Sequence, residues 1–168
     1  MKTFIFFDLE QTLIPDWFED RVTLIPNVHP ALKEWIFNQM PFTAGLLSFA
    51  VGNNDMDVFN NELRPHIETN LHFKFDDKWI LTVEAMNEMM NKWNHTPFEK
   101  DNCSIFKKFG IMHAIWKNLF IEDDTRVILL DDTVEDMIIH RTTIMDKHTE
   151  TVTNNSLEFV NPWTIIRQ

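Results

Sequence analysis

Two short apolar runs in this chain each stop at a pair of acidic residues. The runs and their acids are Phe4–Phe7 with Asp8 and Glu10, and Val127–Leu130 with Asp131 and Asp132. Short runs rich in aromatic, branched and aliphatic residues are typical of buried strands. In open α/β sheets, ligands bind outside the carboxyl ends of the strands. If the two strands are parallel, both acid pairs therefore lie at the same edge of one sheet.

The rest of the chain alternates strand patterns with helix patterns. Strands are predicted at residues 3–7, 45–51, 126–130 and 157–160, and helices from Pro30 to Pro41, at 55–69, from Thr82 through Trp93, at 110–120 and at 133–140. Residues 71–81 are ambiguous, with a turn at Asp76-Asp77. This alternation predicts a three-layer α/β/α, Rossmann-like fold with a mainly parallel sheet. The length of 168 residues suits a single domain over 1–168.

Composition limits the partners and the compartment. The formal net charge of −11 makes extended nucleic-acid binding unlikely, because phosphate backbones require clustered Lys and Arg. A small phosphorylated substrate bound with a divalent cation stays compatible with this acidity, since the cation supplies the local positive charge. Only 3 glycines are present, so no glycine-rich phosphate loop is expected. The lone Cys103 cannot form an intramolecular disulfide, which favours a reducing compartment.

No segment of the sequence is typical of membrane insertion. The apolar start of the chain stops at Asp8, well short of a signal-peptide core. The longest other apolar run, Ala44–Val51, is much too short to cross a bilayer. We therefore expect a soluble, cytoplasmic protein with no membrane partner.

Acids that follow strands have two interpretations. They can be ordinary loop residues or helix caps: Asp132 or Thr133 could cap the helix at 133–140, and Thr133 with Asp136 fits a capping box. Two acid pairs together with Thr12 favour a functional site instead. Clustered carboxylates repel one another strongly unless a cation lies among them, and oxygen ligands suit Mg²⁺.

The two acidic segments resemble signatures of one enzyme superfamily. Residues 4–14 are similar to the first motif of the haloacid dehalogenase (HAD) superfamily, which is an apolar strand, Asp, any residue, Asp, any residue, Thr and an apolar residue. Residues 127–132 are similar to its last motif, an apolar strand that ends in two acids. Glu10 departs from the pattern, because the family has Asp at that position.

The resemblance implies a Mg²⁺-dependent phosphatase and a role for each acid. Asp8 would be both the nucleophile that forms an aspartyl-phosphate and a metal ligand. Asp131 and Asp132 would hold Mg²⁺ directly or through water. Glu10 would offer its backbone carbonyl to the metal and its side chain as general acid and base. A carboxylate nucleophile splits one difficult displacement into two easier steps, and the metal offsets the repulsion between anions.

The resemblance also implies contacts to the phosphoryl group. We assign Thr12, Asn53 and Lys108 to this set. Lys108 is favoured over its neighbour Lys107 because it is closer to the helix that leads into the last motif. The family has a Ser or Thr at the end of the second strand, but the strand predicted at 45–51 ends without a hydroxyl. Asn53 is therefore the candidate there, ahead of Ser48, which is predicted to be buried in mid-strand.

The segments where this superfamily inserts cap domains are short here. Residues 9–28 and 53–107 leave no room for a separate cap, which implies a capless HAD-like domain with an exposed site. Such a site would admit a nucleotide or another phosphorylated substrate. In the first of these segments, Trp17 and Phe18 either stack on a substrate ring or pack against the domain itself.

The sequence thus predicts a HAD-like phosphohydrolase that acts on a phosphomonoester with Mg²⁺. A catalytically degenerate metal- or protein-binding module is the alternative, since the extra methylene of Glu10 displaces its carboxyl and a misplacement of about 1 Å can cost on the order of a hundredfold in rate. A phosphoacceptor receiver domain is a third hypothesis. It is disfavoured because the adjacent acid pair, Asp131-Asp132, comes late in the chain.

Overall fold

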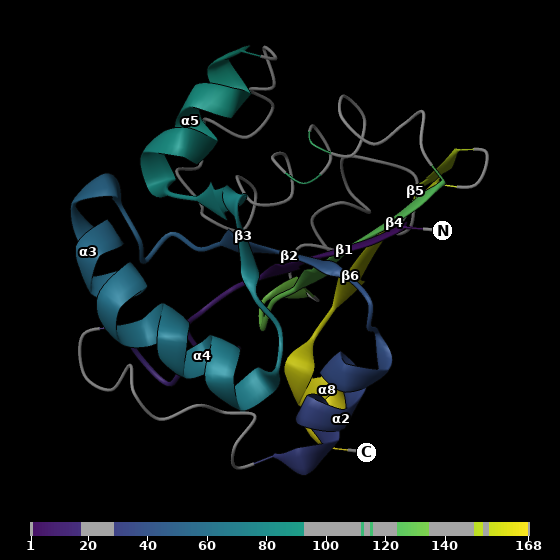
Figure 1. Ribbon diagram of the computed structural model, residues 1–168. Helices are drawn as coiled ribbons and strands as arrows, with labels where there is room; N and C mark the ends of the chain where they lie inside the picture. Colours follow the sequence, from purple (N-terminus) through teal and green to yellow (C-terminus); the bar gives the residue numbers. More distant parts are fainter. Residues whose placement is uncertain are drawn as a thin grey trace.

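A six-stranded sheet forms the centre of the computed structural model, with the strand order β3-β2-β1-β4-β6-β5 (Figure 1). The structure describes residues 2–17, 29–92, 112, 115, 124–134, 150–152 and 155–167. The strands are β1 Lys2–Phe7, β2 Thr43–Leu47, β3 Phe75–Leu81, β4 Thr125–Leu130, β5 Glu150–Val152 and β6 Asn155–Val160. All neighbours pair in parallel except β5, which runs antiparallel to β6 at one edge. The α/β class with a mainly parallel sheet is confirmed, and the arrangement is compatible with a Rossmann-like fold.

The described helices follow β1, β2 and β3 along the chain, and α8 follows the last strand, β6. The helices are α2 Pro30–Asn38, α3 Met56–Val58, α4 Arg64–Leu71, α5 Val83–Lys92 and α8 Pro162–Ile166, with a 3-10 turn η1 Asn53–Asp55 and a π-helical turn η2 Phe59–Leu63. Thr82 begins α5 as predicted, because its hydroxyl accepts a hydrogen bond from the Ala85 backbone N–H.

Apolar side chains pack against both faces of the sheet. Along β1, Ile5 and Phe7 belong to one buried cluster and Phe6 to another, as the two-residue period of a strand requires. The first cluster includes residues of α2, α4 and α8, and the second includes Met86 of α5. Figure 1 shows α2, α4 and α8 gathered on one side of the sheet, with α5 on the other. A strand buried on both faces explains why β1 is apolar almost throughout.

Two local predictions are wrong. The second strand ends at Leu47 rather than at residue 51, because the Ser48 hydroxyl accepts a hydrogen bond from the Ala50 backbone N–H and turns the chain. Asp76-Asp77 is not a turn but part of β3, where both side chains are exposed.

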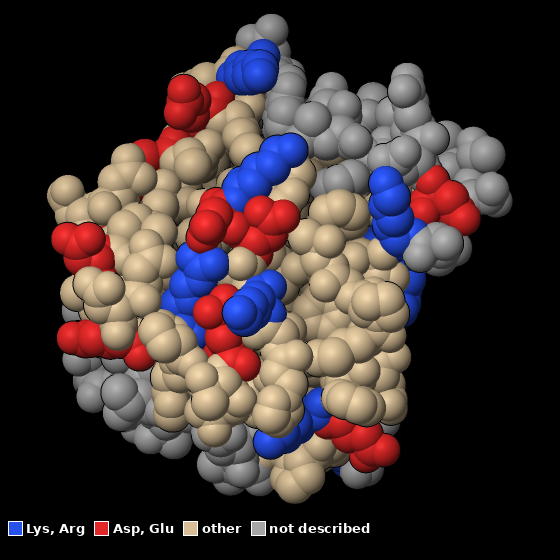
Figure 2. Space-filling model, viewed as in Figure 1, with Lys and Arg blue, Asp and Glu red and all other residues tan. Residues whose placement is uncertain are grey.

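Charged side chains at the outer side of the edge strand β3 have a structural role. Arg64 of α4 binds Asp77 and the backbone carbonyl of Phe75, and acidic and basic side chains are interspersed over the face seen in Figure 2. Charged side chains on an edge strand discourage pairing with another chain.

The remaining predictions lie partly beyond the described residues. Met112 and Ile115, the two described residues of the helix predicted at 110–120, are helical and buried. The predicted helix at 133–140 is described only as far as Val134. Among the described helices, none has the length and apolar character needed to cross a membrane.

Candidate functional site

The two acidic segments lie side by side at the carboxyl edge of the sheet. Asp8 directly follows β1, Asp131 directly follows β4, and the last residues of these strands, Phe7 and Leu130, are paired. The Asp8 backbone N–H donates to the Leu130 carbonyl at 3.0 Å, which extends the ladder to the acid itself. Parallel pairing of two apolar strands thus joins acids that are far apart in sequence.

Three carboxylates converge at this edge. Asp8, Asp131 and Asp132 each offer an oxygen, and these oxygens lie within 4.8 Å of one another. Asp8 and Asp131 are buried, whereas Asp132 is half-buried. Burial first, and then the neighbouring charges of Asp8 and Asp131, raise the pKa of Asp132 to about 8. A cation held among the three would remove this penalty, and a set of hard oxygen donors matches what Mg²⁺ prefers.

Thr12 joins the two acidic segments through one hydroxyl group. Its Oγ1 donates to Asp8 Oδ2 at 3.1 Å and accepts from the Asp132 backbone N–H at 3.2 Å. Thr12 is completely buried and does not line the pocket beside the acids. The structure therefore places Thr12 behind the Asp8 carboxylate and not at the pocket surface, where the predicted contact to a phosphoryl group would require it.

A tight turn after β1 carries Glu10 to the pocket. The Leu9 carbonyl accepts hydrogen bonds from the N–H groups of Thr12, Leu13 and Ile14, and Gln11 has a left-handed φ of 60°. Glu10 lines the pocket, and its Oε2 accepts from the Trp17 backbone N–H at 3.2 Å. Its carboxylate is not one of the three that converge within 4.8 Å.

Asp131 also organises the start of the segment that follows it. Its Oδ1 accepts from the Thr133 backbone N–H at 2.9 Å and from the Thr133 hydroxyl at 2.7 Å. In the described part of this segment Asp131 is the acceptor, and the predicted capping box of Thr133 with Asp136 lies outside the described residues. Asp131 caps the segment while its carboxylate stays in the acid cluster.

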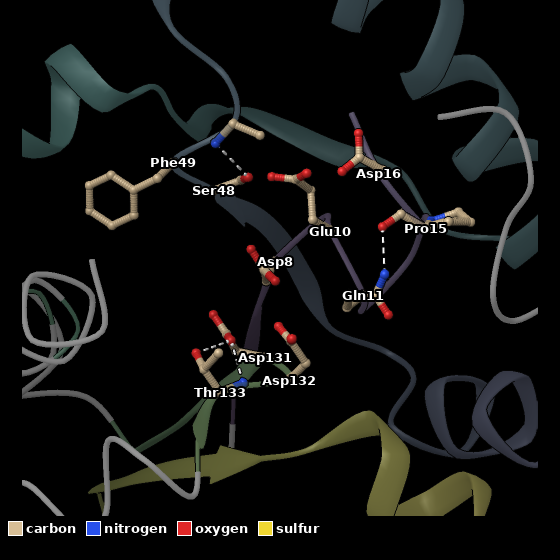
Figure 3. Close-up of a pocket in the computed structure, with 11 residues that line it drawn as sticks. Asp8, Glu10, Gln11, Pro15, Asp16, Ser48, Phe49, Asp131, Asp132 and Thr133 are labelled. Carbon is tan, nitrogen blue, oxygen red and sulfur yellow. Dashed lines mark hydrogen bonds between the residues drawn. The ribbon is translucent and has the colours of Figure 1, made fainter. Parts of the chain in front are cut away.

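A pocket of about 330 Å³ opens over these acids. It is lined by Asp8, Glu10, Gln11, Pro15, Asp16, Ser48, Phe49, Ala50, Asp131, Asp132 and Thr133. Figure 3 shows the carboxylates of Glu10 and Asp16 on one side of the pocket, and those of Asp131 and Asp132 on the other, with Asp8 between them. Sequence reasoning missed Asp16. Its position just after Pro15 in the first loop was the only available signal.

Ser48, not Asn53, stands at the end of the second strand next to the acids. Because β2 ends at Leu47, Ser48 lies at the carboxyl edge and lines the pocket although it is only 1% exposed. Asn53 lies elsewhere: its Oδ1 accepts from the Thr82 hydroxyl at 2.7 Å, and its backbone N–H donates to Glu84 at 2.8 Å. The structure thus does not bring Asn53 to the site.

The other predicted residues divide into two groups. Trp17 is buried in the core, which supports packing over stacking on a ligand. Lys107, Lys108 and Phe18 lie outside the described residues.

No known protein-family model, curated protein or solved structure matches this chain significantly. What the site can do chemically therefore has to be inferred from its own residues.

Proposed function

We propose that the protein is a Mg²⁺-dependent phosphohydrolase that cleaves a phosphomonoester through an aspartyl-phosphate on Asp8. The observation that carries the proposal is the convergence of three carboxylates at the ends of β1 and β4, in a pocket with Glu10 beside them. The proposal includes the finer architecture expected for such an enzyme, a single three-layer HAD-like domain over 1–168 without a separate cap.

Each acid has a defined part in the proposed reaction. An oxygen of Asp8 attacks phosphorus while the bond from phosphorus to the leaving oxygen breaks, and Glu10 gives its proton to that oxygen. Water then attacks the phosphoryl group, Glu10 takes the proton from the water, and Asp8 is released with inorganic phosphate. Splitting the displacement into two steps is the advantage of a carboxylate nucleophile.

The residues that would hold Mg²⁺ are Asp8, Asp131 and Asp132, together with the backbone carbonyl of Glu10. When bound, the cation would offset the charge of the nucleophile and of the substrate phosphate. Thr12 fixes the orientation of the Asp8 carboxylate. Ser48 lines the pocket and can donate its hydroxyl hydrogen to a phosphoryl oxygen, since in the hydrogen bond that it makes with Ala50 the hydroxyl is the acceptor. Lys108 stays the proposed cationic contact.

One observation favours a second candidate function, a catalytically degenerate module that binds a metal or a protein. The Glu10 carboxylate accepts a hydrogen bond from the Trp17 backbone N–H, which holds part of it against its own loop. A carboxyl kept in this way would leave the metal cluster intact while proton transfer slows.

Hydrolysis of an aryl phosphate with Mg²⁺ tests the proposal. We expect turnover in the wild type, a loss of kcat on the order of a thousandfold or more in Asp8→Asn, and a loss of about 10²- to 10⁴-fold in Glu10→Gln, which keeps an acceptor for Trp17. Asp16→Asn is the comparison variant, because it removes another pocket carboxylate and so measures how much of a loss comes from the change in pocket charge alone.

Two results would contradict the proposal, and only the first of them would favour the second candidate. One is Mg²⁺ binding without turnover in the wild type, combined with activity in Glu10→Asp. It would mean that the longer side chain of Glu10 prevents catalysis while the metal site is kept. Equal turnover in the wild type and Asp8→Asn would rule out the aspartyl-phosphate.

A further inference from the structure

The segment after β6 is joined to both acidic loops by a closed ring of hydrogen bonds. Trp163 Nε1 donates to the Gln11 carbonyl at 2.8 Å, and the Trp163 backbone N–H donates to Asn161 Oδ1 at 2.9 Å. Asn161 Nδ2 donates to the Asp132 carbonyl at 3.3 Å, and the Asp132 N–H donates to Thr12 Oγ1 at 3.2 Å. Thr12 follows Gln11 in the chain, so the ring closes on itself.

The ring holds the backbone of Asp132 from both sides. Thr12 accepts from its N–H and Asn161 donates to its carbonyl, so the peptide groups on either side of this residue are fixed. The Asp132 carboxylate belongs to the cluster with Asp8 and Asp131. A change in the Asp132 backbone therefore changes the spacing of the cluster.

The ring also holds a strained residue of the first loop. Gln11 has φ 60°, a conformation that costs a residue with a side chain roughly 1 kcal/mol or more. Three hydrogen bonds keep it there: its N–H donates to Ile14, its side chain donates to Pro15, and its carbonyl accepts from Trp163. Gln11 lies between Glu10 and Thr12, so this turn determines where both of them point.

The helix that supplies these contacts is itself anchored in the core. Pro162 and Ile165 of α8 are buried, and Ile165 belongs to the cluster that includes α2. The Trp163 ring packs edge-on against His29 at the start of α2, with 5.7 Å between ring centroids. The donors on Asn161 and Trp163 thus project from an element whose position is fixed independently of the acids.

We propose that Asn161 and Trp163 are positioning residues that set the separation between the Asp8 loop and Asp132, through the backbone carbonyls of Gln11 and Asp132. Their importance for metal binding rests on the proposed function, but the effect on the geometry of the Asp132 backbone does not. Neither residue touches the pocket.

Two substitutions open the ring with little change in packing. Trp163→Phe keeps an aromatic ring and removes the indole N–H. Asn161→Ser keeps a good N-cap for α8 but is too short to reach the Asp132 carbonyl. Thr164→Val is the matched control, because Thr164 Oγ1 donates to the Asn161 carbonyl within α8 and makes no ring contact to either loop.

The first readout is amide hydrogen exchange in the full chain without metal, followed residue by residue by NMR. Both substitutions should speed exchange of the Asp132 N–H about three- to tenfold, the range expected for loss of one hydrogen bond, while the Ile128 N–H in β4 stays protected. The double variant should change less than the product of the two single changes, because one opening already breaks the ring. Exchange at Asp132 equal to that of Thr164→Val, or a rise spread equally over Ile128, would overturn the proposal.

The second readout is Mg²⁺ affinity by calorimetry. Weakening by about threefold or more in Asn161→Ser and Trp163→Phe, but not in Thr164→Val, supports the positioning role. Wild-type affinity in both ring variants would overturn it. A wild type that binds no Mg²⁺ would count against the proposed function, while the exchange result would still decide whether the ring positions Asp132.

Discussion

At the scale of single residues, the charge of Asp132 is coupled to folding. Its pKa is raised from 3.8 in the unfolded chain to about 8 in the folded protein, by burial first and then by Asp8 and Asp131. Between these two values the folded state binds a proton that the unfolded state has lost. The stabilisation from this proton is full below about pH 4 and disappears as the pH rises through about 8.

This linkage predicts the pH dependence of the metal-free protein. The melting temperature in EDTA should fall as the pH rises from 5 to 8. Asp132→Asn, which carries no charge at any pH, should flatten this profile. Bound Mg²⁺ should flatten it in the wild type too, because the cation favours the charged carboxylate. Parallel slopes for wild type and Asp132→Asn in EDTA would show that Asp132 does not cause the dependence.

Ser48 and Asn53 give a second test at this scale. Ser48→Ala should raise KM for an aryl phosphate several-fold, the size expected for one hydrogen bond to the phosphoryl group. Asn53→Ala should leave KM unchanged and lower stability instead, because the Thr82 hydroxyl loses its acceptor. Steady-state kinetics of both variants, with urea unfolding as a folding control, measures this contrast. The reverse pattern would return the phosphate contact to Asn53.

At the scale of elements, the outcome of sequence reasoning depended on how each strand ends. β1 and β4 were predictable because a continuous apolar run stops at an acid. The end of β2 was not, since Phe49, Ala50 and Val51 continue the apolar run after Ser48 and only a local hydrogen bond turns the chain. In the edge strand β3, Asp76 and Asp77 suggested a turn, because Asp is common both in turns and at the exposed positions of an edge strand. The Thr12 bridge and Asp16 depend on tertiary contacts that no local pattern encodes.

The packing of β2 against β1 depends on a glycine. A Cβ on Gly45 would lie 2.7 Å from two ring carbons of Phe6 and 3.0 Å from the Trp79 carbonyl. Phe6 is 1% exposed, so its ring has no space to move away. Gly45→Ala should therefore lower the free energy of unfolding by about 1–3 kcal/mol, as measured by urea denaturation.

Gly52→Ala provides the control for this substitution. Its Cβ would meet first a carboxylate oxygen of Glu84 at 3.2 Å, the end of a flexible side chain. We expect a loss under about 1 kcal/mol there. Equal losses at both glycines would mean that the contact with Phe6 does not determine the loss at Gly45.

At the scale of the whole molecule, repulsion among the three clustered carboxylates destabilises the folded state, in a chain whose formal net charge is already −11. A cation bound only by the folded state stabilises it by mass action, by about 2.7 kcal/mol at a concentration one hundred times Kd. For a domain of this size we expect Mg²⁺ to raise the melting temperature by about 5–10 °C. Thermal unfolding with Mg²⁺, compared with NaCl of equal ionic strength, measures the shift.

The specificity of this shift can be tested with Asp131→Asn. The amide keeps an acceptor for Thr133 but removes one charge from the cluster, so the response to Mg²⁺ should largely disappear. If the variant responds as strongly as the wild type, the cation acts on the general negative surface rather than on the three carboxylates.

The ring that ties Gln11 to Trp163 has a consequence for how the protein is made. These residues are 152 positions apart, and synthesis proceeds from the amino end. While the chain is still growing, Asp8 and Glu10 have already left the ribosome, but Asn161 and Trp163, which hold their loop, have not yet been translated. The braced form of the site therefore needs the last segment of the fold as well as the first. It is completed only when the segment after β6 has left the ribosome, so nascent fragments that end before Asn161 lack the braced arrangement of acids.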